Sequence, residues 1–281
     1  MKGKITLLDG AVGTTLWSIA EAHGEKKEPV WKYNIEHPEF VEELTRSYLE
    51  AGSEIILANT FGSNAPAVKR SSSYTVNDVI TSGVRIAKNV LDGTGVRLCL
   101  ALGPLTQLLE PYGDLEEDEC AAIYDEMLDA GIKAGCEMIL IQTFMDLEMM
   151  RVATVEAKKH GLPVFCSMTF EKSGKTMFGN SVDDVIETLS PLGIDAIGLN
   201  CSLGPDLAIP IIKEFSEKTD LPLIFKPNAG KPIMSSDGTS VTPYSAAKFA
   251  EEIKPALEYV SYIGGCCGAD AEYVKEIKKL L

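Results

Sequence analysis

The chain alternates short apolar runs with longer amphipathic segments from end to end. This alternation predicts repeated strand–helix units, which place parallel strands side by side in one sheet. The apolar runs that are long enough to be strands number eight: 5–8, 54–58, 97–102, 137–141, 164–168, 196–199, 223–225 and 259–263. An amphipathic segment follows each run, and the predicted helices begin near Pro38, Asn77, Leu115, Asp146, Val182, Asp206, Tyr244 and Asp270. Several of these starts carry the Asp, Asn or Pro that favours helix entry.

Eight strand–helix units in 281 residues are typical of a (β/α)8 barrel, the TIM barrel of the α/β class. A doubly wound open sheet has the same alternation, but it more often carries a glycine-rich phosphate turn after its first strand. The turn after the first predicted strand, Asp9-Gly10-Ala11-Val12-Gly13-Thr14, does not match that fingerprint. We therefore predict a barrel, and we expect residues 1–281 to form a single domain.

In a barrel of this kind the residues that follow each strand meet on one face, where active sites are built. The residues at the predicted strand ends are Asp9-Gly10, Asn59-Thr60, Gly103-Pro104, Gln142-Thr143, Thr169, Asn200-Cys201, Pro227-Asn228 and Gly264-Gly265-Cys266-Cys267. Polar and thiol groups thus converge on this face. Two long segments without a clear period, 10–37 and 60–76, are expected to be irregular loops at the same mouth.

Composition and charge narrow the functions available to such a barrel. The net charge of -15 would repel a phosphate backbone, which argues against nucleic-acid binding and against attachment to an anionic membrane. The N-terminus lacks the apolar stretch of a signal peptide or membrane helix, so we expect a cytoplasmic protein. The 7 cysteines have no regular spacing and fit a reducing compartment. Small-molecule chemistry is the expectation that remains.

Three of the cysteines stand at predicted strand ends, Cys201 after the sixth strand and Cys266 with Cys267 after the eighth. Three thiolates on one zinc ion leave a fourth position free, which is typical of catalytic rather than structural sites. Packing as small apolar groups is the alternative, and it is the expectation for the remaining cysteines, Cys99, Cys120, Cys136 and Cys166. Gly264-Gly265 could instead hold a phosphate, but adjacent thiolates and the scarcity of Lys and Arg nearby argue against it.

The glycine-rich turn that begins at Asp9 could be only a tight turn, but its place at the mouth suggests a binding role. Exposed backbone N–H groups in such a turn can hold a carboxylate, and Asp9 could accept from an ammonium group beside it. An amino-acid substrate would satisfy both contacts. Asn59, Thr60 and Asn228 are further candidates for substrate contact, although each could equally satisfy loop backbone.

These residues together resemble the homocysteine S-methyltransferase family, zinc-dependent thiol methyltransferases that include the N-terminal domain of cobalamin-dependent methionine synthase. The resemblance runs nearly end to end and rests on Leu8-Asp9-Gly10-Ala11-Val12-Gly13-Thr14, Ala58-Asn59-Thr60-Phe61, Gly198-Leu199-Asn200-Cys201 and Gly264-Gly265-Cys266-Cys267-Gly268. It implies that Cys201, Cys266 and Cys267 bind the zinc. It also implies that Asp9, Gly10 and Ala11 bind the amino-acid end of homocysteine.

One position departs from the family pattern. The family typically has Glu-Thr after the fourth strand, where its carboxylate receives the substrate ammonium group, but this chain has Gln142-Thr143. Glutamine keeps an acceptor oxygen and loses the charge, which weakens a charge-assisted hydrogen bond by about 1–2 kcal/mol. Zinc is therefore a firmer expectation than homocysteine.

The resemblance also implies a methyl donor. Two segments are closer to the methionine synthase branch than to enzymes that use S-adenosylmethionine or betaine. They are Asn200-Cys201-Ser202-Leu203-Gly204-Pro205 and Pro227-Asn228-Ala229-Gly230-Lys231-Pro232. The expected donor is therefore a methyl-corrinoid (cobalamin). Nothing in the chain resembles the corrinoid-binding or folate-binding domains, so this group would sit on a separate protein. A corrinoid protein and a subunit that activates the methyl donor are the expected partners.

The expected reaction methylates homocysteine to methionine, because a thiol bound to zinc loses its proton without a separate base. Donation from S-adenosylmethionine or S-methylmethionine, or demethylation of a substrate onto a corrinoid protein, are alternatives within methyl transfer. A zinc hydrolase is less favoured, because three thiolates raise the pKa of bound water. A non-enzymatic zinc-binding barrel subunit, with a fourth ligand such as Asn228 closing the site, is the remaining alternative.

Overall fold

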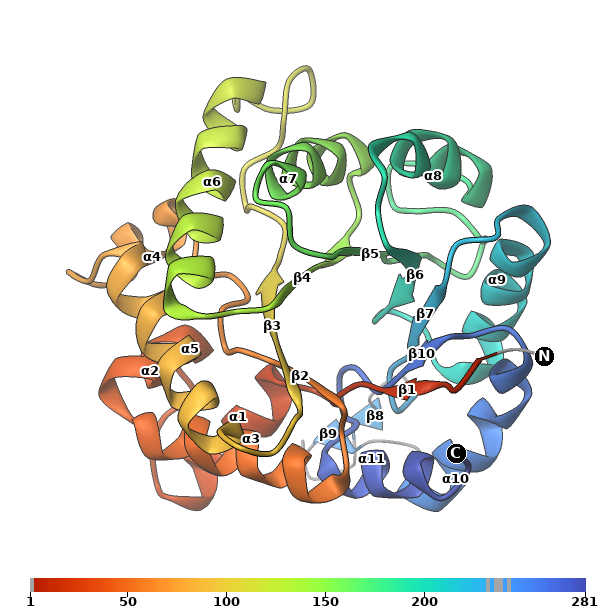
Figure 1. The fold of residues 1–281 in the computed structure, drawn as a ribbon, viewed down its shortest axis with the longest axis horizontal. Helices are drawn as coiled ribbons and strands as arrows, with labels where there is room; N and C mark the ends of the chain where they lie inside the picture. The colour runs from red at the N-terminus through yellow and green to blue at the C-terminus, as the bar shows by residue number, and fades with distance from the viewer. Residues whose placement is uncertain (1–2, 231–232, 235–239, 242–243) are drawn as a thin grey trace.

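The computed structural model describes residues 3–230, 233–234, 240–241 and 244–281. Its main sheet has eight parallel strands in the order β1-β10-β7-β6-β5-β4-β3-β2. Their bounds are β1 Thr6–Leu7, β2 Ile55–Leu57, β3 Arg97–Leu102, β4 Met138–Phe144, β5 Val164–Met168, β6 Ala196–Asn200, β7 Leu223–Lys226 and β10 Tyr262–Ile263. A parallel bridge from Leu8 to Ile55 joins the two ends of that order. The sheet therefore curls into a nearly closed barrel (Figure 1), and the predicted (β/α)8 fold is confirmed.

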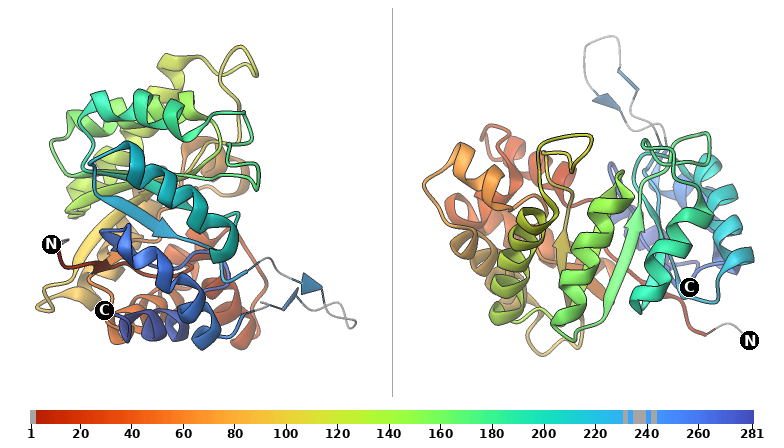
Figure 2. Two further views of the ribbon diagram at one scale, coloured as in Figure 1. Left: turned by 90° about the vertical axis from the view of Figure 1, so that its right-hand side faces the viewer. Right: turned by 90° about the horizontal axis from the view of Figure 1, so that it is seen from above.

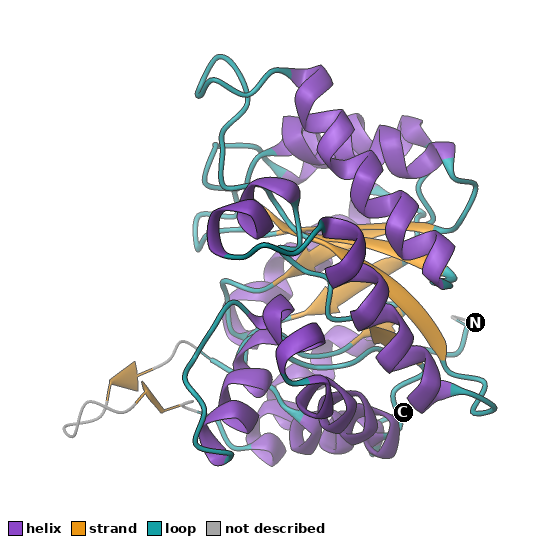
Figure 3. Ribbon diagram, turned by 90° about the vertical axis from the view of Figure 1, so that its left-hand side faces the viewer, coloured by secondary structure: helices purple, strands orange, loops and turns teal. Residues whose placement is uncertain are grey.

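Helices form the outer layer around the strands (Figures 1 and 3). The helices that were predicted are α3 Pro38–Ala51, α5 Val76–Leu91, α6 Glu117–Ala134, α7 Leu147–Lys159, α8 Val182–Leu189, α9 Pro205–Lys218, α10 Ala246–Ile253 and α11 Ala271–Lys278. The expected capping residues fix two of these starts, since Asp146 and Asp270 accept hydrogen bonds from the first N–H groups of α7 and α11. Short 3-10 turns, η2 Ser190–Leu192 and η3 Lys254–Glu258, extend α8 and α10. Within the described part of the chain, none of the helices is long and apolar enough to cross a membrane.

The segments 10–37 and 60–76 contain short helices, so the prediction that they are irregular loops is wrong. The first contains α1 Gly13–Ala22, the 3-10 turn η1 Val30–Lys32 and α2 Tyr33–Glu36, and the second contains α4 Ala65–Ser71. In α1 only Leu16 and Ala20 are buried, its N-cap position has no capping side chain, and α2 is little more than one turn. Neither helix therefore presents the long apolar stripe or the capping residue by which helices are recognised in a sequence.

Strand ends differ from their predicted positions in a way that matters for the site. The ranges of β3 and β5 are as predicted, whereas β4, β6 and β7 run further and include Gln142, Asn200 and Lys226. After β7 the chain also forms a separate antiparallel pair, β8 Ile233–Met234 and β9 Ser240–Val241. Figure 2 shows this pair projecting from the side of the barrel at which the strands end.

The barrel interior has an apolar layer below a polar one. A cluster separate from the main core consists of alternate residues of neighbouring strands: Leu8, Ile55, Leu57, Cys99, Ala101, Met138, Leu140, Phe165, Ala196 and Ile224. Because side chains on a strand alternate between its two faces, the residue two positions further along lies on the same face. Leu140 is thus followed by Gln142, and Ile224 is followed by Lys226. The polar layer lies at the carboxyl ends of the strands, above this apolar floor.

Candidate active site

Three cysteines come together at the carboxyl ends of β6 and β10. The Sγ atoms of Cys201, Cys266 and Cys267 all lie within 4.8 Å of one another, and we call this group the thiol cluster. The Sγ atoms of Cys201 and Cys267 are 3.7 Å apart. Zn–S bonds of about 2.3 Å in a tetrahedral site place neighbouring sulfur atoms roughly 3.8 Å apart. The donor type and the spacing therefore fit a zinc ion with one position left for another ligand.

Backbone hydrogen bonds between strands fix the thiol cluster. The Cys201 N–H donates to the Lys226 carbonyl at 3.0 Å, and the Cys266 N–H donates to the Pro227 carbonyl at 2.9 Å. Both cysteine segments thus bond to the end of β7. Cys201 also has a φ of 62°, a left-handed conformation that is uncommon for a residue other than glycine. Such conformations persist where the surrounding structure enforces them, which is frequent at functional sites.

The protein groups around the thiol cluster raise the pKa of each of its three thiols. A hydrogen bond with Cys201, together with burial, raises the pKa of the Cys266 thiol to about 12. The Cys266 thiol lowers the pKa of Cys201, but Cys267 and burial outweigh it and bring the pKa to about 11. Cys201 likewise lowers the pKa of Cys267, whereas Cys266 and burial raise it to about 12. A divalent cation would reverse these shifts, because metal binding deprotonates a coordinating thiol.

Asn200 connects the thiol cluster to β4 and β5. Its Oδ1 accepts hydrogen bonds from the Thr143 N–H and from the Ser167 hydroxyl, both at 2.9 Å. Its Nδ2 donates to the Thr143 Oγ1 at 2.7 Å and to the Cys266 Sγ at 3.7 Å. Sequence reasoning placed Asn200 at a strand end but assigned it no role. Its contact with the Cys266 Sγ restricts the direction of that thiol.

A cavity of about 310 Å³ opens beside the thiol cluster. Its wall consists of Gly10, Ala11, Val12, Gly13, Thr14, Trp17, Val30, Leu57, Ala58, Phe61, Ala101, Gln142, Thr143, Cys201, Lys226, Cys266 and Cys267. The predicted site residues Gly10, Ala11 and Gln142 therefore lie in one cavity with all three thiols. The N–H of Ala11 is already bound to the Ala269 carbonyl at 2.8 Å, so this group does not face a substrate.

Asp9 lies behind the cavity wall and already has two partners. Its Oδ1 forms an ion pair with the Lys226 Nζ at 2.6 Å, and its Oδ2 accepts from the Leu57 N–H at 2.8 Å. Asp9 is 0% exposed and Lys226 is 1% exposed. Sequence reasoning gave Asp9 a substrate ammonium group and did not consider Lys226. The alternation of inward and outward side chains along β7 could have identified Lys226, because this residue follows Ile224 on the inner face of the barrel.

Asn59, Thr60 and Asn228 are not part of the cavity wall. The Asn59 Nδ2 donates to the Val30 carbonyl and to the Asn34 Oδ1, at 2.8 and 2.7 Å. The Thr60 Oγ1 donates to the Ala101 carbonyl at 2.9 Å, and all three predicted residues are buried. In the described part of the chain, the side-chain oxygens of Asn59 and Asn228 have no hydrogen-bond partner. The contacts of Asn59 and Thr60 are those of residues that support the loops above β2. Lys231 and Pro232, which belong to the segment quoted with Asn228, lie outside the described residues.

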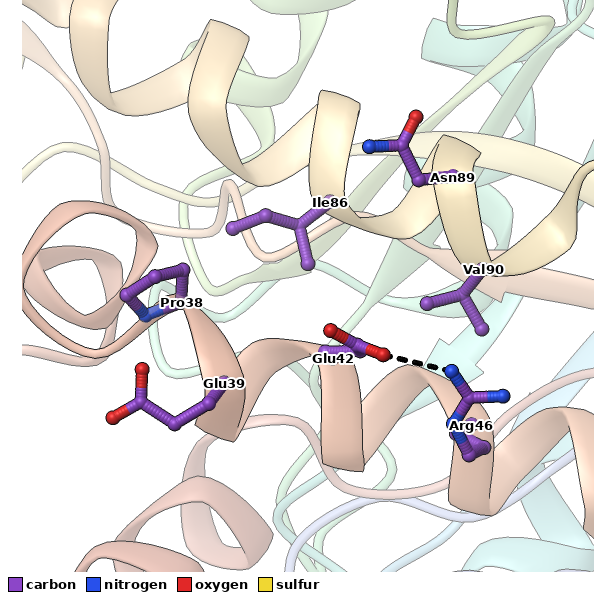
Figure 4. Close-up of a pocket in the computed structure, with 7 residues that line it drawn as sticks. All are labelled: Pro38, Glu39, Glu42, Arg46, Ile86, Asn89 and Val90. Carbon is purple, nitrogen blue, oxygen red and sulfur yellow. Dashed lines mark hydrogen bonds and ion pairs between the residues drawn. The ribbon is translucent and has the colours of Figure 1, made fainter.

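A second hollow lies on the outer surface between α3 and α5 (Figure 4). It is lined by Pro38, Glu39, Glu42, Arg46, Ile86, Asn89 and Val90. The Arg46 guanidinium and the Glu42 carboxylate pair across one helical turn at 2.7 Å, and both are half-exposed. Such exposed ion pairs contribute little to the stability of the fold. The residues that line this hollow include no nucleophile and no metal-ligating cluster. The cavity beside the thiol cluster is therefore the candidate active site.

A (β/α)8 barrel with a thiol cluster whose spacing fits a metal ion, beside a cavity at its strand ends, is the arrangement of a barrel enzyme. The comparison with known families is more specific, since a model of the homocysteine S-methyltransferase family matches residues 6–281. The chain belongs to this family of methyltransferases.

Sequence relatives agree with this family. The chain is 29% identical to methionine synthase of Mycobacterium tuberculosis over 261 residues, which cover 87% of this chain and 22% of that protein. It is also 29% identical over 262 residues to methionine synthase of Mycobacterium leprae, 21% of which is covered. The chain thus spans about a fifth of the length of the curated relatives that it matches.

Solved structures agree on the fold. The homocysteine methyltransferase MmuM from Escherichia coli, in its metallated form, superposes with a TM-score of 0.81 at 19% sequence identity. This match covers 99% of the present chain and 96% of the other. The carboxyl transferase domain of pyruvate carboxylase from Rhizobium etli superposes less closely, with a TM-score of 0.58 and 11% identity. At these identities the likeness concerns the barrel alone.

Proposed function

We propose that this chain is a zinc-dependent thiol S-methyltransferase that methylates homocysteine to methionine. The observation that carries the proposal is the thiol cluster, three Sγ atoms within 4.8 Å of one another in the wall of the cavity. Three thiol ligands leave one position of a zinc ion for a substrate thiol. The family to which the chain belongs supports homocysteine as that thiol. We take residues 1–281 to be a single catalytic domain.

The residues of the cavity supply binding and positioning. Zinc bound by Cys201, Cys266 and Cys267 would supply Lewis acidity, which keeps a thiol ligand deprotonated and nucleophilic. The start of α1 faces the cavity through Gly13 and Thr14, so its first N–H groups and the positive end of its dipole favour a substrate carboxylate there. The apolar residues of the wall flank the carbon chain between carboxylate and sulfur, and they exclude water from the reacting sulfur.

We further propose that the methyl donor is a methyl-corrinoid (cobalamin) held outside residues 1–281. The support is the likeness to two methionine synthases, of which the matched segment is only about a fifth. In the transfer the substrate thiol loses its proton, its sulfur forms the new S–CH3 bond, and the electron pair of the broken donor bond stays on the donor. The expected partners are a corrinoid protein and a subunit that restores its methyl group.

We also propose that the protein works in the reducing cytoplasm. All seven cysteines are free, and three of them must remain thiols to bind metal. An oxidising compartment would favour disulfides between thiols as close as 3.7 Å. This placement is independent of which donor supplies the methyl group.

The proposal is tested by zinc content and by methyl transfer to homocysteine in the native protein, in Cys201→Ala and in Cys267→Ala. We expect about one zinc per native chain and loss of both zinc and methyl transfer in each variant, because two thiols hold the ion poorly. Cys136→Ala is the matched control, since this buried thiol lies outside the cluster. Methylcobalamin, S-adenosylmethionine and S-methylmethionine are compared as donors, and the first is expected to be the most effective. Stoichiometric zinc and undiminished transfer in both cluster variants would refute the proposal.

A further inference from the structure

The wall of the cavity contains one charged side chain, Lys226. The polar groups beside it are neutral, namely Gln142, the threonines and the three thiols. An amino-acid substrate carries both a carboxylate and an ammonium group, so a cavity that recognised both by charge would present both a cation and an anion. Among the described residues that line the cavity, a carboxylate is absent.

Asp9 does not fill the place of the missing carboxylate. It is 0% exposed, it is not part of the wall, and its two oxygens are taken by the Lys226 ammonium and the Leu57 N–H. A substrate ammonium group could reach Asp9 only by displacing Lys226. That displacement would leave the Lys226 charge buried without a partner, which is strongly unfavourable.

Two features favour an anion in the same cavity, and a third can serve either an anion or a cation. Lys226 has three N–H donors, and in the described residues its one hydrogen-bond partner is Asp9. The ten-residue helix α1 begins at the wall with no capping side chain and no acidic residue in its first turn. The Gln142 side chain is 8% exposed, lines the cavity and has no hydrogen-bond partner in the part of the chain that the structure describes. Its amide can donate to an anion or accept weakly from an ammonium group.

We infer that this cavity recognises the anionic end of the acceptor thiol and does not require an ammonium group. The acceptor class is therefore the mercaptocarboxylates, of which homocysteine is one member and its deaminated analogue, 4-mercaptobutanoate, is another. This inference rests on the proposed function and narrows its substrate recognition to Lys226, Gln142 and the start of α1.

The inference predicts how binding depends on each end of the ligand. A hydrogen bond from an ammonium group to the uncharged Gln142 amide has one charged partner and accounts for up to about tenfold in affinity, whereas a contact between a carboxylate and the Lys226 ammonium has two and accounts for about 10- to 100-fold. Loss of the amino group should therefore weaken binding by less than about tenfold. Loss of the carboxylate should weaken it by more than about tenfold, because Lys226 then faces a cationic ligand.

Equilibrium binding of product thioethers tests this without a methyl donor. Calorimetry with the zinc-loaded protein compares methionine, its deaminated analogue 4-(methylthio)butanoate and its carboxylate-free analogue methioninol. We expect the first two to bind within about tenfold of each other and methioninol to bind more weakly than either. If 4-(methylthio)butanoate binds 100-fold or more weakly than methionine, the inference is overturned.

Two variants assign the effect to the named residues. Gln142→Glu places a carboxylate in the wall, so it should raise the preference for methionine over 4-(methylthio)butanoate by about tenfold or more. Gln107→Glu makes the same change on an exposed loop residue and should leave the preference unchanged. The double variant Asp9→Asn with Lys226→Met removes both charges of the pair, and it should abolish the preference for the anionic ligand over methioninol. An unchanged preference in both cavity variants would contradict the inference.

Methyl transfer separates failure of the inference from failure of the proposed function. If no donor methylates homocysteine, the proposed function fails. If homocysteine is methylated but 4-mercaptobutanoate has a kcat/KM at least 100-fold lower, the function stands and the inference fails. We expect the two thiols to differ by less than about tenfold.

Discussion

The ion pair between Lys226 and Asp9 predicts a large loss of stability for Lys226→Met. Both side chains are buried: the side-chain atoms are 2% exposed in Lys226 and 1% exposed in Asp9. The Lys226 Nζ and the Asp9 Oδ1 are 2.6 Å apart. Methionine fills the space of the lysine stem but removes the cation. Asp9 is then left with the Leu57 N–H as its remaining partner in the described structure. A buried carboxylate without a counter-ion is far less favourable in the protein than in the unfolded chain in water.

The magnitude follows from similar buried pairs. Removing one partner of a buried ion pair costs about 3–5 kcal/mol. Unfolding a chain of 281 residues has an entropy of about 0.6 kcal/mol per kelvin, at roughly 2.1 cal/mol/K for each residue. The variant should therefore unfold about 5–8 °C below the native protein. Circular dichroism at 222 nm and scanning calorimetry would both measure this midpoint.

Two further variants separate the charge effect from the loss of packing. Lys133→Met removes an ammonium that lies 2.7 Å from Asp129, but here both side chains are exposed. This change should cost about 0.5 kcal/mol or less. Adding Asp9→Asn to Lys226→Met removes the unpaired charge and should recover at least about half of the loss. If Lys226→Met shifts the midpoint no more than Lys133→Met, or if the double variant is no more stable than Lys226→Met, the electrostatic reasoning is refuted.

Two other predictions concern zinc binding and acid stability. Asn200→Ala removes the Nδ2 contact with the Cys266 Sγ, so zinc affinity measured against a chelator should fall by about 10- to 100-fold while the thiols remain; unchanged affinity would exclude a role in orienting Cys266. Ser181 and Asp184 form the cap at the start of α8, and hydrogen bonds from the Ser181 N–H and hydroxyl lower the pKa of Asp184. The ionised Asp184 therefore stabilises the folded protein at pH values above its unfolded pKa, near 3.8. This stabilisation is lost as the pH falls through the lower pKa of the folded state. Asp184→Asn should therefore be less stable than the native protein at pH 6 and equally stable at about pH 2, in denaturation at each pH; a difference that persists in acid would contradict the cap as its source.

The barrel could be predicted because each of its units repeats one pattern. The ranges of β3 and β5, 97–102 and 164–168, follow directly from apolar runs that end at polar or turn residues. The helices α1 and α2 could not be predicted in this way, because α1 contributes only two side chains to the core and α2 is little more than one turn long. Both helices pack against α3, and a short helix of this kind is stabilised by tertiary contacts, which are not encoded as a local period.

The thiol cluster could be predicted because barrel geometry alone brings the ends of the sixth and eighth strands to one face. The ion pair beside it could not be predicted from the sequence. Lys226 and Asp9 are 217 residues apart, and a strand period gives only the face on which each lies. The same limit applies to Asn200, whose partners Thr143 and Ser167 belong to two other strands. Sequence pattern thus predicted which residues reach the mouth, whereas side-chain hydrogen bonds across the barrel decide which of them remain available to a ligand.

Gly264 and Gly265 lie between the strands that carry the two partners of the ion pair. Lys226 on β7 and Asp9 after β1 are not on neighbouring strands, because β10 lies between these two. The Gly264 N–H donates to the Phe225 carbonyl and the Gly265 N–H donates to the Asp9 carbonyl, each at 3.1 Å, so the glycines continue β10 through this gap. A Cβ on Gly264 would lie 2.5 Å from the Asp9 carbonyl oxygen. A Cβ on Gly265 would lie 2.4 Å from the Ala269 Cβ, so both positions require glycine for backbone packing. This packing role accounts for two adjacent glycines before the cysteines without a bound phosphate.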